Sequence, residues 1–248
     1  MTIEIVTYAN KSHGLFERLI HNKFNAKVTV LGMGTVWNGF PDKTRGMVKY
    51  LKTKRDDDIV VFLDGFDSLI VRDPVDVAKI FKSMNCKVLV SKDPGGWIGR
   101  TIFGTCGDSE YTANAGMYMG YAKQLLEVVS ESERMPCTDD QINLNVICRM
   151  HDFIKLDEEC VIFRNIAVSE DDPTHNAIFV SYPATMNVQR YTRAFKEYAQ
   201  FGRWYVTVFM IAAFVIVPHR YKWMPILASI VSAVAYMLFA DRSCEYIT

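Results

Sequence analysis

An apolar run that ends in two carboxylates constrains the fold of this chain more than any other feature. Residues 59–63 are all apolar and mostly β-branched or aromatic, and Asp64, Gly65, Phe66 and Asp67 follow directly. Such a run predicts a buried strand. Ligands of open α/β sheets bind beyond the carboxyl ends of the strands, where two acids on a glycine turn can hold a hard divalent cation together with a phosphate. The same residues also fit an ordinary turn with solvated acids.

Segments typical of strands and helices alternate through the N-terminal part of the chain. Strands are expected at residues 3–8, 27–31, 59–63, 87–90 and 114–120, and helices at residues 15–23, 44–54, 74–84 and 123–132. This alternation predicts an α/β fold with a doubly wound, mostly parallel sheet. Short strands near residues 160–163 and 178–180 should complete this sheet, and the glycine-rich residues 95–109 should form a loop over the site.

Two polar segments mark the expected starts of helices. Asp73 precedes Pro74, a pairing that favours aspartate as the N-cap and proline at the first helical position. Residues 138–141 have the form of a capping box, in which Thr138 would cap a helix and Gln141 would reach back to it.

Charge and cysteine content exclude some classes of function. Lys+Arg and Asp+Glu number 28 each, so no global basic field favours nucleic acid as a partner. The six cysteines show no CxxC and no regular spacing, which favours reduced thiols over a disulfide frame or a zinc site. No charged-then-apolar leader precedes the strand at residues 3–8, so a reducing compartment is expected for the N-terminal domain.

The C-terminal part is far more apolar than the rest. Residues 204–217 and 223–240 contain no charge, and the second run would span about 27 Å as a helix, close to the hydrocarbon thickness of a bilayer. These runs predict a globular domain at residues 1–200 and a membrane-anchoring helical hairpin at residues 201–248. Two buried core helices are the alternative. Basic residues stand both in the turn between the runs and before the first run, so charge alone is ambiguous. The larger cluster before the first run, together with the lack of a leader, predicts a cytoplasmic globular domain.

Several short motifs occur in a fixed order between residues 5 and 180. They are residues 6–9, residues 31–34 with Trp37 and Gly39, residues 48–52, residues 62–67, residues 90–93, residues 114–116 with Gly120, and residues 139–141. In this order the chain resembles the glycosyltransferase domain of the procollagen lysyl hydroxylases and related collagen glucosyl/galactosyltransferases.

The resemblance implies a GT-A fold, a UDP-sugar donor, and Mn²⁺ or Mg²⁺ as the cofactor. Carried over by position, Asp64 and Asp67 would be the metal ligands. Thr7, Trp37 and Phe66 would line the uridine pocket, with an aromatic ring stacked on the base.

The resemblance also implies a sugar side and an acceptor side. Asn114 would face the donor sugar, with Asp93 near it, while Lys43 lies near the place expected for a phosphate-binding cation. Asp139 and Asp140 match part of the family's acidic run near donor sugar and acceptor, although acids in the first turn of a helix also favour its dipole.

One departure from the family concerns the third metal ligand. The family has a histidine, followed by glycine, after a late strand, and Ser181 stands there in this chain. His175 lies a few residues earlier but reads better as a surface histidine. The metal would then be held by two carboxylates, diphosphate and water, or the domain would be impaired.

Taken together, these observations predict a metal-dependent glycosyltransferase that moves a sugar from a UDP-sugar to a hydroxyl acceptor at a membrane. The acceptor would be a glycan, a lipid-linked glycan or a protein, and the membrane contact would be made through residues 201–240. The alternatives are a nucleotidyltransferase that uses the same acidic turn, and a non-catalytic membrane protein that keeps the scaffold.

Overall fold

The structure is a computed structural model that describes residues 3–166 and 176–183, together with residues 221, 223, 224, 227 and 244. The chain divides into two compact units, Met1–Thr185 with Ile247–Thr248, and Met186–Tyr246. The expected hairpin at residues 201–248 lies, apart from those five single residues, outside the described part. Within that part, no helix has the length and apolar character needed to cross a bilayer.

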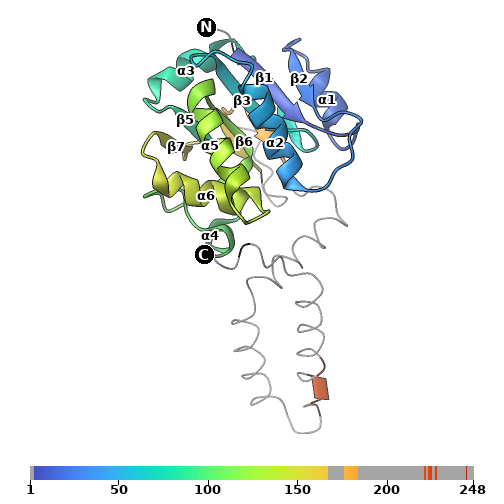
Figure 1. The fold of residues 1–248 in the computed structure, drawn as a ribbon, viewed down its shortest axis with the longest axis vertical. Coiled ribbons are helices and arrows are strands. Elements are labelled where there is room, and N and C mark those ends of the chain that lie inside the picture. Colours follow the sequence, from blue (N-terminus) through green and yellow to red (C-terminus); the bar gives the residue numbers. More distant parts are fainter. Residues whose placement is uncertain are drawn as a thin grey trace. The chain divides into compact units, whose positions relative to one another are not determined.

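A six-stranded sheet in the order β2-β1-β3-β6-β5-β7 organises the first unit (Figure 1). Its strands are β1 (Ile3–Tyr8), β2 (Val28–Leu31), β3 (Ile59–Asp64), β5 (Val88–Lys92), β6 (Ala113–Tyr121) and β7 (Ile154–Asp157). All of them run in one direction except β6, which is antiparallel to β3 and β5. The mostly parallel α/β sheet is therefore confirmed. Because β6 is reversed, it begins at the edge where β1, β3 and β5 end.

A second sheet of three strands, in the order β4-β9-β8, stands apart from the first. It consists of β4 (Ser68–Ile70), β9 (Phe179–Ser181) and β8 (Phe163–Asn165). The prediction that the two late strands complete the main sheet is therefore wrong. A short apolar segment shows that one face is buried but does not specify its partner, and β7 takes the place at the edge of the main sheet.

Helices cover both faces of the main sheet. They are α1 (Phe16–Ile20), α2 (Phe40–Leu51), α3 (Val77–Ser83) after a 3₁₀ turn at Pro74–Asp76, α4 (Gly96–Phe103), α5 (Ala122–Arg134) and α6 (Asp140–Met150). The predicted loop at residues 95–109 is wrong in its first half, because α4 forms there in spite of its glycines. Asp73 does cap its turn, accepting from the Val75 N–H at 3.0 Å. The last helix begins one residue later than expected, since Asp139 and not Thr138 is its N-cap.

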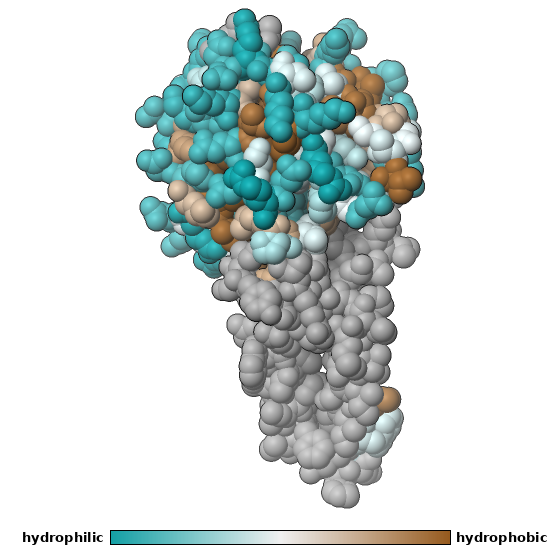
Figure 2. Space-filling model, in the orientation of Figure 1, coloured by the Kyte–Doolittle hydropathy of each residue, from teal (hydrophilic) through white to brown (hydrophobic). Residues whose placement is uncertain are grey.

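The central strand is buried on both sides, which explains its unbroken apolar run. Val60 and Phe62 belong to the core cluster shared with α2, α5 and α6, whereas Val61 and Leu63 belong to the cluster shared with α1 and α3. The ring of Phe62 stacks on Tyr118 of β6 with centroids 4.8 Å apart. Each such side chain contributes about 1.5–3 kcal/mol through burial. On the face shown in Figure 2, the surface of the described residues is mostly hydrophilic, with a few apolar patches.

A disulfide joins Cys106, in the loop after α4, to Cys148 of α6, with Cα atoms 4.9 Å apart. The prediction of reduced thiols is therefore wrong for this pair, and it is also wrong for Cys137 and Cys244, which are disulfide-bonded. Cys86 and Cys160 are free. Pairing depends on which residues the tertiary fold brings together, and sequence spacing does not reveal that.

Candidate functional site

The candidate site lies at the edge where β1, β3 and β5 end and β6 begins. The ladder pairs Tyr8 with Asp64, so β1 and β3 end side by side, and it pairs Leu63 with Met117 in the middle of β6. Asn114 starts β6 at the same edge, next to the end of β5. The topology therefore gathers side chains that are far apart in the sequence, as expected for the ligand edge of an open sheet.

The acidic turn packs tightly against β1 because Gly65 has no side chain. A Cβ on Gly65 would lie 2.9 Å from both the Thr7 Oγ1 atom and the Tyr8 carbonyl oxygen. Asp64 ends β3 beside the bare backbone of Gly116, where an added Cβ would be 3.7 Å from the Asp64 Oδ2 atom. The glycines thus let three backbone segments meet around this carboxylate.

Asp64 itself is half-buried and makes no side-chain hydrogen bond or ion pair with any residue that the structure describes. Asp67 is supported differently, because the Ser181 hydroxyl donates to its Oδ1 atom at 3.0 Å. The Tyr182 N–H also donates to the Asp67 carbonyl oxygen at 2.9 Å. In the place of the expected histidine, β9 therefore presents a buried hydroxyl to the second aspartate.

These donors define which metals would fit. Within residues 3–166, 176–183 and the five single residues, no group of three His, Cys, Asp or Glu side chains is arranged to hold a metal ion. A closed structural zinc site needs four protein ligands, so it does not fit. Two aspartates do fit Mg²⁺ or Mn²⁺, because such ions keep some of their waters and are coordinated by one or two carboxylates together with substrate phosphates. His175 lies outside the described residues.

At the place expected for the donor sugar, Asp93, Asn114 and Gln141 form a closed hydrogen-bond network. The Asp93 Oδ2 atom accepts from the Asn114 amide at 3.1 Å and from the Gln141 amide at 2.9 Å. The Asp93 Oδ1 atom accepts from the Gly95 N–H at 2.7 Å, and Asn114 Nδ2 also donates to Gln141 Oε1 at 3.3 Å. The structure thus brings together two predicted residues and adds Gln141, which sequence reasoning placed in a capping box.

Asp139 and Asp140 begin α6 and have different surroundings. The Asp139 Oδ1 atom accepts from the backbone N–H groups of Gln141 and Ile142 at 2.9 and 3.1 Å, so it caps the helix. Asp140 is paired with Lys43 of α2. The Lys43 ammonium also lies 3.4 Å from the Ala115 carbonyl oxygen of β6. Lys43 was expected near the phosphates, and the structure shows it buried and bound to a carboxylate of its own chain.

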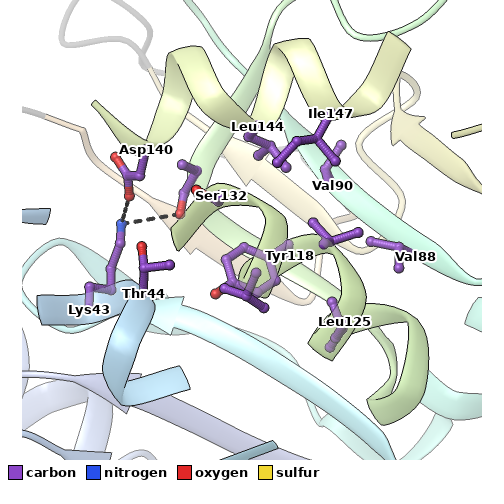
Figure 3. Close-up of a pocket in the computed structure, with 13 residues that line it drawn as sticks. Lys43, Thr44, Val88, Val90, Tyr118, Leu125, Ser132, Asp140, Leu144 and Ile147 are labelled. Carbon is purple, nitrogen blue, oxygen red and sulfur yellow. Dashed lines mark hydrogen bonds and ion pairs between the residues drawn. The ribbon is translucent and has the colours of Figure 1, made fainter. Parts of the chain in front are cut away.

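A small cavity lies behind this ion pair (Figure 3). Its volume is about 30 Å³, which is room for one or two waters. Lys43 and Asp140 face each other at its polar end, Tyr118 forms a wall, and the remaining lining is mainly apolar, from β5, α5 and α6. Burial raises the pKa of Tyr118 above its ordinary value, and the negative charges of Asp140 and Asp64 raise it further.

The residues expected to hold the nucleotide base lie around the ends of β1 and β3. Trp37 is 42 % exposed, and its ring lies 5.7 Å from that of Tyr8. Phe66 meets His13 edge-on at 5.6 Å. Thr7 is fully buried, and its hydroxyl has no hydrogen-bond partner among the described residues. Trp37 thus offers an accessible aromatic surface, and Thr7 an unsatisfied polar group.

Comparisons with known proteins show which family model and which relatives the chain is similar to. The family model described as "PLOD GT domain" matches residues 1–194. Human procollagen-lysine,2-oxoglutarate 5-dioxygenase 1 is 28% identical over 187 residues, and human procollagen-lysine,2-oxoglutarate 5-dioxygenase 2 is 26% identical over 188 residues. The chicken form of the first is also 26% identical, over 188 residues. Each of these matches covers 68% of this chain and 26% of the relative, so the chain spans about a quarter of their length.

Proposed function

The chain belongs to the PLOD GT domain family, and from this premise we propose that it is a metal-dependent glycosyltransferase that moves a sugar from a UDP-sugar to a hydroxyl acceptor. The family match supports the glycosyltransferase class. The finer proposal rests mainly on one observation, the Asp64 carboxylate at the end of β3. A half-buried carboxylate without a partner in the described protein is costly, and a bound cation would offset that cost.

Asp64 and Asp67 would hold the cation. When bound, a divalent ion neutralises the charge that develops on the leaving diphosphate, acting as a Lewis acid. The protein's own contribution is to fix the two carboxylates, through the Gly65 turn against β1 and through the Ser181 hydroxyl on Asp67. Trp37 offers an exposed ring on which a uracil base can stack, and Thr7 offers an unpaired hydroxyl at the same strand ends.

The sugar would lie against the Asp93–Asn114–Gln141 network. The Asn114 Oδ1 atom accepts from the Gly116 N–H at 2.8 Å, so the orientation of this amide is fixed before any substrate binds. Pre-oriented dipoles of this kind lower the barrier because they do not reorganise during the reaction. Asp139 and Asp140 lie at the start of α6. The charge of Asp140 is balanced by Lys43, so Asp139 is the carboxylate that would stabilise an oxocarbenium-like transition state or accept the acceptor proton.

The acceptor and the location are further parts of the proposal. The names of the relatives concern procollagen lysine, but the chain spans only a quarter of those proteins, so their whole activity does not transfer. We propose a glycan, lipid-linked glycan or protein acceptor, with anchoring to a membrane through residues 201–240. Placement of the domain in the cytoplasm remains a prediction, and the Cys106–Cys148 disulfide contradicts the reduced thiols that contributed to the expectation of a reducing compartment.

A screen of UDP-sugars for slow hydrolysis tests the proposal without knowledge of the acceptor. We expect release of UDP from one or a few donors with Mn²⁺ or Mg²⁺ present, and none after chelation by EDTA. Turnover of nucleoside triphosphates with sugar phosphates instead would favour a nucleotidyltransferase. Absence of both activities, and of any heat-stability shift with UDP and Mn²⁺, would favour the non-catalytic scaffold.

That scaffold is the second candidate for a specific reason. Among the described residues, no third acid, histidine or cysteine forms a metal-binding group with Asp64 and Asp67. A pocket that has lost its cation affinity would show the same feature.

A further inference from the structure

Ser181 occupies a rigid position next to the acidic turn. It ends β9, where it is paired with Ser68 of β4 on one side and with Asn165 of β8 on the other. Its carbonyl oxygen accepts from the Ile166 N–H at 2.9 Å. Ser68 follows Asp67 directly in the chain, so the ladder places Ser181 beside this aspartate. The position of the serine is therefore set by two neighbouring strands and not by a loop.

The Ser181 side chain is turned toward the Asp67 carboxylate and away from solvent. The residue is 1% exposed, and its hydroxyl donates to the Asp67 Oδ1 atom at 3.0 Å. The Ser68 hydroxyl approaches the same oxygen at 3.4 Å. Hydrogen bonds to an ionised acceptor are shorter and stronger than those between neutral groups, so the Ser181 bond restricts how the carboxylate can rotate.

We infer that Ser181 is a positioning residue for the cation site: its hydroxyl holds the Asp67 carboxylate in the orientation that binds a divalent ion. The inference rests on the proposed function, because it assumes that Asp64 and Asp67 bind a cation. Groups that hydrogen-bond to metal ligands fix the ligand's direction and so contribute to metal affinity without touching the ion. Because no third ligand joins Asp64 and Asp67 among the described residues, the orientation of each carboxylate affects cation affinity more than it would in a site with four protein ligands.

Titration of Mn²⁺ into the full chain, with UDP present and free Mn²⁺ followed by its paramagnetic resonance signal, tests this role. The signal of hydrated Mn²⁺ falls as the ion binds. The same titration with UDP alone gives the part due to the nucleotide, so the difference reports affinity for the protein and needs no turnover. For Ser181→Ala we expect Mn²⁺ affinity to fall on the order of tenfold. Ser181→Thr keeps a hydroxyl in a residue suited to strands and should recover most of that affinity.

Two further variants separate the hydrogen bond from folding and packing. Ser181→Cys fills nearly the same space with a weak donor, so its Mn²⁺ affinity should fall as well. If the alanine variant does not fold, the Ser181→Cys variant still tests the positioning role. Asn22→Ala is the matched control, because Asn22 is a buried polar residue that bonds to the Leu19 and Ala26 carbonyl oxygens before β2 starts, at the opposite edge of the sheet. It should cost stability and leave Mn²⁺ affinity unchanged.

The outcomes are distinguishable. If the wild-type chain binds Mn²⁺ with UDP and the Ser181→Ala and Ser181→Cys variants bind it equally well, the positioning role is refuted and the proposed function stands. If the wild-type chain shows no UDP-dependent binding of Mn²⁺, the proposed function fails, and this inference fails with it.

Discussion

Asp64 is the last residue of β3 and Asp93 follows β5, both at the same edge of the sheet, but their carboxylates differ in their hydrogen bonds. Asp93 receives hydrogen bonds from the Gly95 backbone and from the Asn114 and Gln141 amides. Asp64 receives none from any described residue, although it is half-buried. A carboxylate satisfied from within holds the structure, whereas one left without a partner is suited to a ligand that comes from outside. The difference separates the scaffold of the site from its reactive part.

Asp64→Asn should produce the largest effect if this division is correct. The neutral amide removes a cation ligand worth several kcal/mol of transition-state stabilisation, so UDP-sugar hydrolysis should fall on the order of a thousandfold. The free energy of unfolding should not fall in the metal-free protein, because no described contact is lost and a half-buried charge without a described partner is removed. Urea unfolding and a UDP-release assay check the two parts.

Asp57→Asn is the matched control for that variant. Its side chain is 62% exposed, and it precedes the amino end of β3. It should leave hydrolysis unchanged. Full activity of Asp64→Asn would contradict the assignment of Asp64 to the cation.

Lys43→Met should produce the largest loss of stability. It leaves the Asp140 carboxylate buried without its cation, and removal of one partner of a buried ion pair costs about 3–5 kcal/mol. Methionine keeps most of the packing, so the lower end of that range is expected. The double variant Lys43→Met with Asp140→Asn should recover part of the loss. Denaturant unfolding of the wild type, of each single variant and of the double variant completes the cycle. An unchanged stability of the single variant would show that the pair is not buried as described.

Gln141→Ala should have a smaller effect, because it acts on the hydrogen-bond network around Asp93. It removes one donor to Asp93 and one acceptor of the Asn114 amide, which should lower the free energy of unfolding by about 1–3 kcal/mol. Thermal unfolding measures the loss. We also expect hydrolysis to fall, since the Asn114 amide loses a fixed neighbour. A variant as stable as the wild type would mean that the network does not hold the site.

The smallest effect concerns Asp157, a third carboxylate near this edge. Burial raises its pKa above the ordinary value, in spite of hydrogen bonds from the Val161, Ile162 and Phe163 N–H groups. The folded state therefore binds this proton more tightly than the unfolded state, so its contribution to stability increases as the pH falls from above the folded pKa toward the ordinary value of 3.8.

Asp157→Asn should abolish that contribution. Denaturant unfolding of both proteins between about pH 4 and pH 7 gives the slope of the free energy of unfolding against pH for each, and the two slopes should differ. Identical slopes would show that the pKa of Asp157 is the same in both states.

The residues that sequence reasoning placed well are those whose positions follow from local pattern. The apolar run of β3 is buried on both faces, and Asp73 caps its turn, because burial and capping are encoded within a few neighbouring residues. Asp93 and Asn114 were expected near each other only through the family resemblance. Alternation alone predicts parallel strands, which would put the start of β6 at the edge opposite the end of β5, and the structure shows β6 antiparallel to β5.

What sequence reasoning missed depends on partners that are distant along the chain. The Lys43–Asp140 pair joins α2 to α6, and the Cys106–Cys148 disulfide joins a loop to the same helix. Neither spacing nor composition indicates such a contact. The helix α4 was missed because its glycines favour a loop locally, yet Gly95 and Gly99 leave room for the Asp93 carboxylate, from which a Cβ would stand only 2.7 and 2.8 Å away.

The most direct test of the central claim is the magnetic coupling between bound Mn²⁺ and the phosphorus nuclei of UDP, measured on the protein. If Asp64 and Asp67 share the cation with the diphosphate, the wild-type complex should show strong ³¹P hyperfine coupling, and Asp64→Asn should abolish it. Equal coupling in both proteins would contradict the account, because the cation would then be held by groups other than the carboxylate at the end of β3.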